Sequence, residues 1–419
     1  MQKNGFTRKV LQSAIGLICA SAAGTSMAAE LNQYVSVYGF INGQIESVEA
    51  KGGATPYERR GRISDGNSRI GFTGKVAINE DLKGIWQIEG GLNNFEQGGT
   101  NDNGQTATLE SRNTFVGIDS QRFGRLVIGN SDSVYRSLVG SGGALGGNLG
   151  MTVHGVDGFN NSSAQLSGNQ DSIFSRGESR MKNSVHYLSP ELYGIQAGAS
   201  YGFDEARVSR SDRSRFSLAA RYKWEGLSIG VGYDRQSNTG IDTTQLQRGF
   251  GVILNAQDGN ATTYTKLVAS YALPTGTTLG AGYETARFGI SQFNNPSASS
   301  IYTGNTDNTL KQNAFVLTVA QDFGQASVLA GYGKLGGLKG VRQFTESDFE
   351  AKQVSLMLRY KLNDMLTPYV YFTKITNNAQ ASINLGQSPL KSNNLGTSSA
   401  FLAPGDSPRA IGVGMLARF

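Results

Sequence analysis

The chain has 419 residues, of which 56 are Gly, 38% are hydrophobic and 17% are charged, so it is richer in glycine and poorer in charge than an ordinary soluble domain. One Cys and two His exclude a disulfide framework and a Cys-based zinc site. The sequence contains no run of about 18 apolar residues, which excludes a helical membrane protein.

Residues 1–28 are organised like a secretory signal peptide. The basic residues Lys3, Arg8 and Lys9 precede an apolar stretch over residues 10–23, and small residues follow it. Cleavage there reduces the formal net charge from +6 to about +3, so the charge balance does not predict a nucleic-acid partner. A secreted chain without disulfides that is rich in Gly, Asn, Ser and Thr is typical of the bacterial outer membrane.

Residues 29–419 show a repeated alternation of apolar and polar side chains. In the last run Ile411, Val413 and Met415 share one apolar face, whereas Gly412 lies on the other. A strand with one face in lipid and the other in water must alternate in this way. The pattern recurs in the runs SVYGFINGQI, SRIGFTGKVA, RFSLAARYKW, LSIGVGYDRQ, TKLVASYAL, NAFVLTVAQDF, ASVLAGYGKL, KQVSLMLRYKL and TPYVYFTKI.

Short connections alternate with long polar ones, and together they separate 16 predicted strands. The even number allows an antiparallel barrel to close within one chain. The predicted fold class is all-β, a 16-stranded antiparallel transmembrane β-barrel over residues 29–419; a soluble β-sandwich is the alternative. The strands are expected to begin near residues 33, 68, 82, 110, 124, 181, 194, 213, 226, 261, 277, 310, 325, 350, 365 and 408.

Aromatic residues flank many of these runs, where they would form the girdles that mark both membrane interfaces. Because most aromatics fall in the outward phase, an aromatic slide inside the barrel, as a sugar-specific channel would have, is not predicted. The tyrosines expected to face outward are Tyr187, Tyr201, Tyr222, Tyr233, Tyr271, Tyr283, Tyr360, Tyr369 and Tyr371.

Several motifs carry a family resemblance that covers essentially all of residues 29–419. They are SVYGFINGQIES, NSRIGFTGKVAINEDLKGIWQIE, ESRNTFVGI followed by FGRLVIGNSDS, NSVHYLSPELYGIQAGASYGF and the closing Phe419. In this order they resemble the trimeric general porins of Gram-negative bacteria, particularly those of β-proteobacteria. The resemblance implies a homotrimer in outer-membrane lipid and lipopolysaccharide that passes small hydrophilic solutes by passive diffusion. We expect both termini and the short turns on the periplasmic side.

The longest connection runs over residues 132–179 and contains the small-residue segment GSGGALGGNLG at positions 140–150. A connection of this length is usually functional or disordered. Porins of the resembling family fold their third long loop into the barrel, so residues 132–179 are predicted to form an infolded constriction loop. A mobile surface loop is the alternative.

The resembling family places a ladder of basic side chains on the wall opposite this loop. The matching positions are Arg69 in SRIGF, Arg112 in SRNTF and Arg180 in SRMKN. Strand alternation supports an inward aim, because an Arg that faces lipid near the midplane would cost roughly 2–4 kcal/mol. In the strand of Arg112, this phase places Phe115 outward and Thr114 inward. The alternative is that each Arg only pairs with a neighbouring carboxylate or loop carbonyl.

Lys182 and His186 share the inward phase of the strand of Arg180 and are predicted to line the pore. Ser184 lies between them on the same face, which raises a Ser-His hydrolase as an alternative. Residues two apart on a strand are about 6–7 Å apart, too far for a direct hydrogen bond without help. We therefore predict no enzyme activity, and no cofactor or metal is predicted.

The predicted selectivity follows from the charges near the constriction. Arg136 is expected on or near the infolded loop, and Asp132 is the only acid close in sequence to offset the basic cluster. The local potential is then positive, and anions concentrate there. Arg59, Arg60 and Arg62, in what reads as the first long loop, form either an attracting vestibule or a plain solvated charge run.

The sequence therefore predicts an outer-membrane channel for the passive diffusion of small hydrophilic solutes and ions, with a preference for anions. A substrate-specific channel, or a barrel that serves mainly in adhesion or structure, is the alternative. An adhesin would use the long loops without needing the arginines.

Overall fold

The computed structural model describes most of the chain beyond residue 28. The predicted signal peptide, residues 1–28, and the interior of the predicted constriction loop, residues 141–171, lie outside the described residues. The described residues are 29–32, 35–54, 56–92, 109–140, 172–205, 212–239, 241–242, 261–291, 306–341, 344–386, 389–390 and 402–419.

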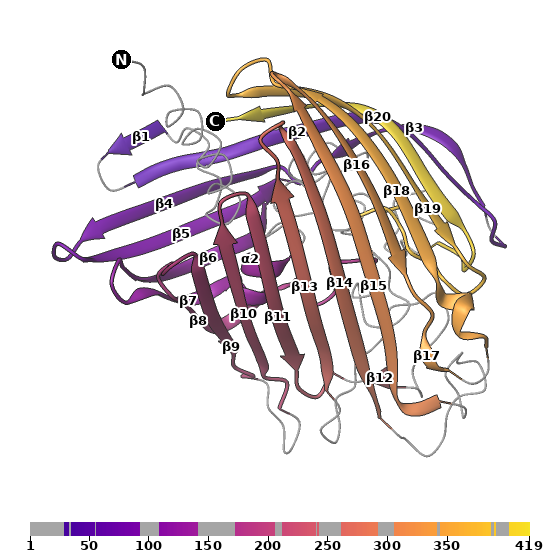
Figure 1. Cartoon of the computed structure of the whole chain (residues 1–419), viewed down its shortest axis with the longest axis horizontal. Helices are drawn as coiled ribbons and strands as arrows, with labels where there is room; N and C mark the ends of the chain where they lie inside the picture. The colour runs from indigo at the N-terminus through magenta and orange to yellow at the C-terminus, as the bar shows by residue number, and fades with distance from the viewer. Residues whose placement is uncertain are drawn as a thin grey trace.

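The fold is a closed antiparallel barrel. β2 (Val35–Lys51) pairs along one edge with β20 (Ser407–Arg418) and along the other with β3 (Tyr57–Asp65) and β4 (Arg69–Ala77), so the first and last barrel strands close the ring (Figure 1). The predicted 16-stranded antiparallel barrel is confirmed. The other barrel strands are β5 (Leu82–Leu92), β6 (Leu109–Ser120), β7 (Gly124–Asp132), β8 (Arg180–Leu188), β9 (Ile195–Gly202), β10 (Arg215–Trp224), β11 (Leu227–Gln236), β13 (Thr262–Ala272), β14 (Thr277–Ser291), β15 (Thr306–Phe323), β16 (Ala326–Leu335), β18 (Ala351–Tyr360) and β19 (Leu366–Asn377).

β3 and β4 together form the second barrel strand, because both pair with β2 on the same edge. Three short strands extend the wall: β1 (Ala29–Asn32) pairs with β2, β12 (Ile241–Asp242) with β14, and β17 (Lys339–Val341) with β15. The predicted strand starts lie within a few residues of the observed ones, except that the second barrel strand begins at Tyr57 rather than near residue 68.

The placement of the basic run at residues 59–62 in a loop was wrong, because this run lies on β3. The segment YERRGRISD carries too many charges to show apolar alternation, so its strand was missed. Arg62 Nε lies 2.7 Å from Glu46 Oε1, and Arg59 Nε lies 3.3 Å from Glu49 Oε2. Part of the positive charge is therefore neutralised by β2.

The outer face of the wall is apolar, and the inner face carries the polar and charged side chains. On β11 the outward Ile229, Val231 and Tyr233 are exposed, whereas the inward, polar Ser228 and Asp234 are buried. This alternation matches a strand with lipid on one side and an aqueous lumen on the other.

Two of the tyrosines expected to face outward were assigned to the wrong face. Tyr369 and Tyr371 on β19 are buried, and their hydroxyls donate to Asn42 and Glu46 across the inner wall. Their rings lie over two glycines of β20, where a side chain would leave no room. The exposed ones are Tyr187, Tyr201, Tyr222, Tyr233, Tyr271, Tyr283 and Tyr360.

The two described ends of the connection 132–179 pack inside the barrel. Helix α2 (Val134–Val139) lies against β10 and β11 with Tyr135 fully buried, and Phe174 joins the same buried apolar cluster. A 3-10 helix, η1 (Glu346–Phe349), occurs in a later connection. Within the described ranges, no helix is long and apolar enough to cross a membrane.

Candidate pore constriction

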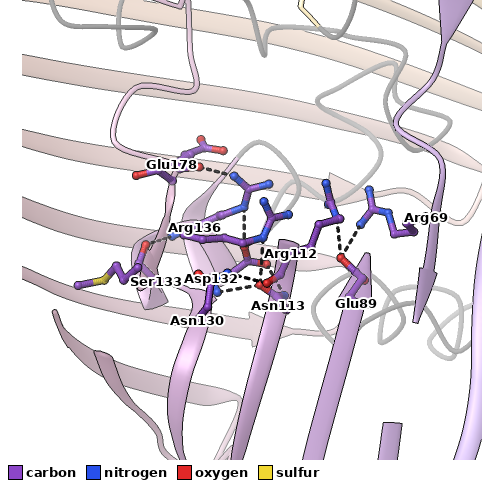
Figure 2. A network of polar contacts seen from close by, with 12 residues as sticks. Arg69, Glu89, Arg112, Asn113, Asn130, Asp132, Ser133, Arg136 and Glu178 are labelled. Carbon is purple, nitrogen blue, oxygen red and sulfur yellow. Dashed lines mark hydrogen bonds and ion pairs between the residues drawn. The ribbon is translucent and has the colours of Figure 1, made fainter. Parts of the chain in front are cut away.

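The charged residues predicted for the constriction come together inside the barrel, four of them on β4 to β8 and Arg136 on α2. Figure 2 shows all of these except Arg180 with labels. Together with Glu89, which was not predicted, we call this group the eyelet cluster. Its members are Arg69 at the start of β4, Glu89 in β5, Arg112 in β6, Asp132 at the end of β7, Arg136 in α2 and Arg180 at the start of β8.

Glu89 holds one half of the eyelet cluster. Its Oε1 lies 2.6 Å from Arg112 Nε and 3.8 Å from Arg69 Nη1. Tyr38 donates a hydrogen bond of 3.0 Å to Glu89 Oε2, and Arg112 Nη1 donates one of 2.9 Å to Asn67. The carboxylate therefore fixes the Arg112 guanidinium by a charge-assisted hydrogen bond and holds that of Arg69 beside it as a longer ion pair.

Asp132 holds the other half. Its Oδ1 lies 2.9 Å from Arg136 Nε and 3.4 Å from Arg180 Nε. Asn113 donates to Asp132 Oδ2 at 3.1 Å and accepts from Arg180 Nε at 3.1 Å. One carboxylate and one amide thus position an Arg from the wall next to an Arg from the connection 132–179.

The start of α2 brings Arg136 to this position. Ser133 caps the helix, since its Oγ accepts from Arg136 N at 3.2 Å, and Val134 N donates to Ser200 Oγ of β9 at 2.9 Å. The guanidinium of Arg136 also donates to the backbone carbonyl of Glu178 (Figure 2). This bond joins the two ends of the connection 132–179.

The eyelet cluster combines four guanidinium groups with two carboxylates, so it carries surplus positive charge. The side chains of Arg136, Arg69 and Arg180 remain 31%, 21% and 18% exposed. These three groups therefore reach solvent, and a field from the surplus charge extends beyond the protein.

Glu89 is the member of the eyelet cluster that was not predicted from the sequence. The phase of its strand could have found it, because Ile88 is exposed on the outer face and Glu89 therefore points inward. Its pairing with Arg69 and Arg112 depends on the register of three neighbouring strands, which alternation alone does not give.

The predicted phase of β6 was wrong beyond Arg112. A bulge places both Arg112 and Asn113 opposite Glu89, since Ile88 pairs with Thr114 but Gly90 pairs with Ser111. An extra residue in one strand reverses the alternation that follows it. Accordingly Phe115, predicted outward, is buried, whereas Thr114, predicted inward, and Val116 are exposed.

His186 does not line the open pore as predicted. It lies on the inner face but is only 5% exposed, and Ser200 connects it to the start of α2, because Ser200 Oγ contacts His186 and accepts from Val134 N. Its Nε2 is 2.7 Å from Ser184 Oγ, so the expectation that this pair is too far apart was also wrong, and its Nδ1 is 2.8 Å from Ser200 Oγ. The two side chains lean toward each other and close the gap that the strand rise leaves.

Lys182 lies at a second bulge, where the register between β7 and β8 shifts and Asn183 takes a left-handed φ of 47°. Its side chain is exposed, and its role in lining the pore stays a prediction. Among the residues that the structure describes, no group of His, Cys, Asp and Glu is arranged to hold a metal ion.

Comparison with known proteins places this barrel among bacterial porins. The family described as Gram-negative porin matches residues 14–380. An outer membrane porin protein of Bordetella pertussis is 23% identical over 396 residues, which cover 85% of this chain and 92% of that protein. The major outer membrane protein P.IB of Neisseria meningitidis is 26% identical over 236 residues, which cover 55% of this chain and 62% of that protein.

Solved structures show the same fold. The anion-selective porin from Comamonas acidovorans superposes with a TM-score of 0.67 at 18% identity, covering 92% of this chain and 99% of that one. The trimer form of OmpT from Vibrio cholerae superposes with a TM-score of 0.60 at 14% identity, covering 92% and 99%.

Proposed function

The chain belongs to the Gram-negative porin family, and from this membership we propose an anion-preferring diffusion channel in which the eyelet cluster is the selectivity filter. As a member of that family it is an integral β-barrel channel protein of the outer membrane. The observation that carries the proposal is the charge balance of the eyelet cluster, which sets four Arg against two carboxylates inside the barrel.

The barrel provides the aqueous path. A ring of about 16 strands encloses a lumen too wide for its own side chains to fill, so water and small hydrophilic solutes can pass without a binding step. The connection 132–179 narrows this lumen, because α2 and residues 172–179 occupy part of its interior. We propose that the remaining passage runs along the eyelet cluster.

The field of the eyelet cluster then sets the sign of the preferred ion. In a passage narrow compared with the Debye length, about 8 Å at physiological salt, the arginine charges are only partly screened. Anions concentrate there and cations are depleted. The fold neighbour described as anion-selective is consistent with this sign.

The proposed oligomeric state, membrane environment and topology are those expected for a Gram-negative porin. We propose a homotrimer in contact with outer-membrane lipid and lipopolysaccharide, in keeping with the trimer form recorded for OmpT of Vibrio cholerae. The exposed apolar face of the wall suits both lipid and a neighbouring barrel. Residues 1–28 are proposed as the signal peptide, and the short turns and both chain ends as periplasmic.

Reversal potentials in planar bilayers test the filter. In a salt gradient, the wild type is expected to pass chloride in preference to potassium, and Arg69→Glu or Arg112→Glu is expected to lower that ratio. Arg122→Glu is the matched control, because it makes the same charge change in a short turn, where the guanidinium stacks over Phe123. A wild type that prefers potassium would contradict the proposed preference, and a ratio lowered equally by all three variants would contradict the role of the eyelet cluster.

A further inference from the structure

A second group of charged side chains lies where residues 172–179 pass over the inner face of β10 to β14. Their side chains are not part of the proposed filter, and we call this group the loop clamp. Its members are Arg176 and Glu178 from the connection 132–179, Arg215 of β10, Asp234 of β11, Lys266 of β13 and Glu284 of β14.

Lys266 and Glu284 form the centre of the loop clamp. Glu284 Oε1 lies 2.5 Å from Arg176 Nε, and its Oε2 lies 2.8 Å from Lys266 Nζ. Lys266 also binds the carboxylate of Glu178 and donates to the carbonyl of Phe174 at 2.7 Å. The adjacent strands β13 and β14 thus hold the connection through the cation Lys266 and the anion Glu284.

Arg215 holds the last residues of the connection. Its Nη2 donates to the carbonyl of Gly177 at 2.5 Å and its Nη1 to the carbonyl of Ser179 at 3.2 Å. Asp234 fixes the guanidinium from the wall side, with its Oδ2 2.9 Å from Arg215 Nε. The returning end of the connection is therefore bound through its backbone as well as through its side chains.

The loop clamp is almost completely buried and electrically balanced, with three cations and three carboxylates. The side chains of Arg176, Lys266, Glu284 and Asp234 are 0% exposed, that of Glu178 is 5% exposed and that of Arg215 is 11% exposed. A buried charge is strongly destabilising when its partner is removed. A shift of residues 172–179 along the wall would separate these ion pairs, so the loop clamp favours a single position of this segment.

The wall is also shaped to receive the connection. A Cβ on Gly232 of β11 would collide with Val139 and Tyr135 of α2, and a Cβ on Gly282 of β14 would collide with Phe174. At both positions the missing side chain lets the connection approach the wall more closely than any other residue would allow.

We propose that the loop clamp is a set of positioning residues that fixes the width of the pore by locking the described ends of the connection, residues 132–140 and 172–179, to the wall. Glu178 links it to the filter, because its carbonyl accepts from Arg136 while its carboxylate binds Lys266. The inference rests on the proposed function, since it concerns the size of the same passage. It goes further by assigning pore size and ion preference to separate groups of residues.

Removal of one buried charge tests the lock. Glu284→Gln leaves Lys266 and Arg176 without their shared carboxylate, and is expected to raise the single-channel conductance, broaden its distribution and admit larger neutral sugars in liposome-swelling assays. Glu350→Gln is the matched control, because it breaks a partly exposed pair with Lys334, 3.1 Å apart, outside the loop clamp.

A second variant tests the same lock without changing any charge. Gly232→Ala is expected to push α2 from the wall and to change the conductance, whereas Gly61→Ala adds the same methyl group where nothing lies within 4 Å and should leave it unchanged. Heat-resistant migration in mild detergent shows for each variant whether the barrel has folded.

The outcomes separate the two proposals. A wild type that does not conduct would contradict the proposed function itself. If the wild type conducts, and folded Glu284→Gln and Gly232→Ala both keep its conductance and sugar cut-off, the loop clamp does not set the pore width. If only Glu284→Gln fails to fold, the result with Gly232→Ala decides, and a conductance equal to that of Gly61→Ala overturns the proposal.

Discussion

The eyelet cluster and the loop clamp are built from the same kinds of side chain on one inner wall, yet they differ in charge balance and in exposure. The eyelet cluster sets four Arg against two carboxylates and leaves several of its guanidinium groups partly exposed. The loop clamp matches three cations with three carboxylates and excludes solvent almost completely.

The difference shows how position decides what an ion pair does. In the loop clamp, unmatched charge would remain in a medium that cannot solvate it, so the charges must balance and their value lies in fixing geometry. In the eyelet cluster, water solvates the surplus charge, so the imbalance persists at little cost and its field extends into the passage. Glu178 contacts both groups: its carboxylate binds Lys266 of the loop clamp, and its backbone carbonyl accepts from Arg136 of the eyelet cluster.

The largest expected effect is on stability, when a buried cation is removed from the loop clamp. Lys266→Met leaves Glu178 and Glu284 without their cation and should lower the free energy of unfolding by about 3–5 kcal/mol. Arg180→Met in the eyelet cluster should cost only about 1 kcal/mol, because Asp132 keeps Arg136 and is partly solvated. Urea titration of the barrel in lipid vesicles, followed by tryptophan fluorescence, measures both.

Equal costs for Lys266→Met and Arg180→Met would break the comparison, because burial would then not distinguish the two groups. A large cost for Arg180→Met would indicate that the eyelet cluster also holds the fold together. A small cost for Lys266→Met would show that the connection can leave the wall without harm to the barrel.

A smaller effect is expected on selectivity, when a carboxylate is neutralised. Glu89→Gln removes one of the two acids of the eyelet cluster and should raise the chloride-to-potassium permeability ratio, measured by reversal potential. The rise should shrink in about 1 M salt, where the Debye length is about 3 Å. Asp234→Asn, which neutralises a fully buried carboxylate of the loop clamp, should move the ratio less. A ratio that Glu89→Gln leaves unchanged would contradict the filter.

Most of the fold could be predicted from the sequence, because apolar outward residues and polar inward residues alternate within the sequence of each barrel strand. The runs that begin near Leu82, Gly124 and Thr277 show this, since the observed strands start at those residues. The strand at Tyr57–Asp65 was missed because ion pairs with β2 stabilise charges that break the apolar pattern. Tyr369 was misplaced because the space for its ring comes from a glycine on another strand.

The candidate site could be predicted only in part. The sequence of one strand shows which of its side chains point inward, but the partners of those side chains lie on other strands. Motif positions and phase identified Arg69 and Arg112, but their partner Glu89 comes from the strand between them, and finding it requires the register. The bulge beside Asn113 is likewise set by pairing rather than by composition. Lys266 and Glu284 of the loop clamp carry no local signal, since their partners lie far away in the chain.

The smallest expected effect concerns a partly exposed carboxylate in a turn, where solvent weakens polar interactions. In the turn before β5, Asp81 Oδ2 accepts from Ser120 Oγ at 2.5 Å and its Oδ1 accepts from Arg122 N at 3.2 Å. The hydrogen bond from Ser120 lowers the pKa of Asp81 below its ordinary value, so the carboxylate stabilises the fold above the unfolded pKa of about 3.9 and loses this effect as pH falls. Asp81→Asn should therefore lower the unfolding midpoint slightly near neutral pH and not at about pH 2. An equal difference at both pH values would show that the charge of Asp81 contributes nothing.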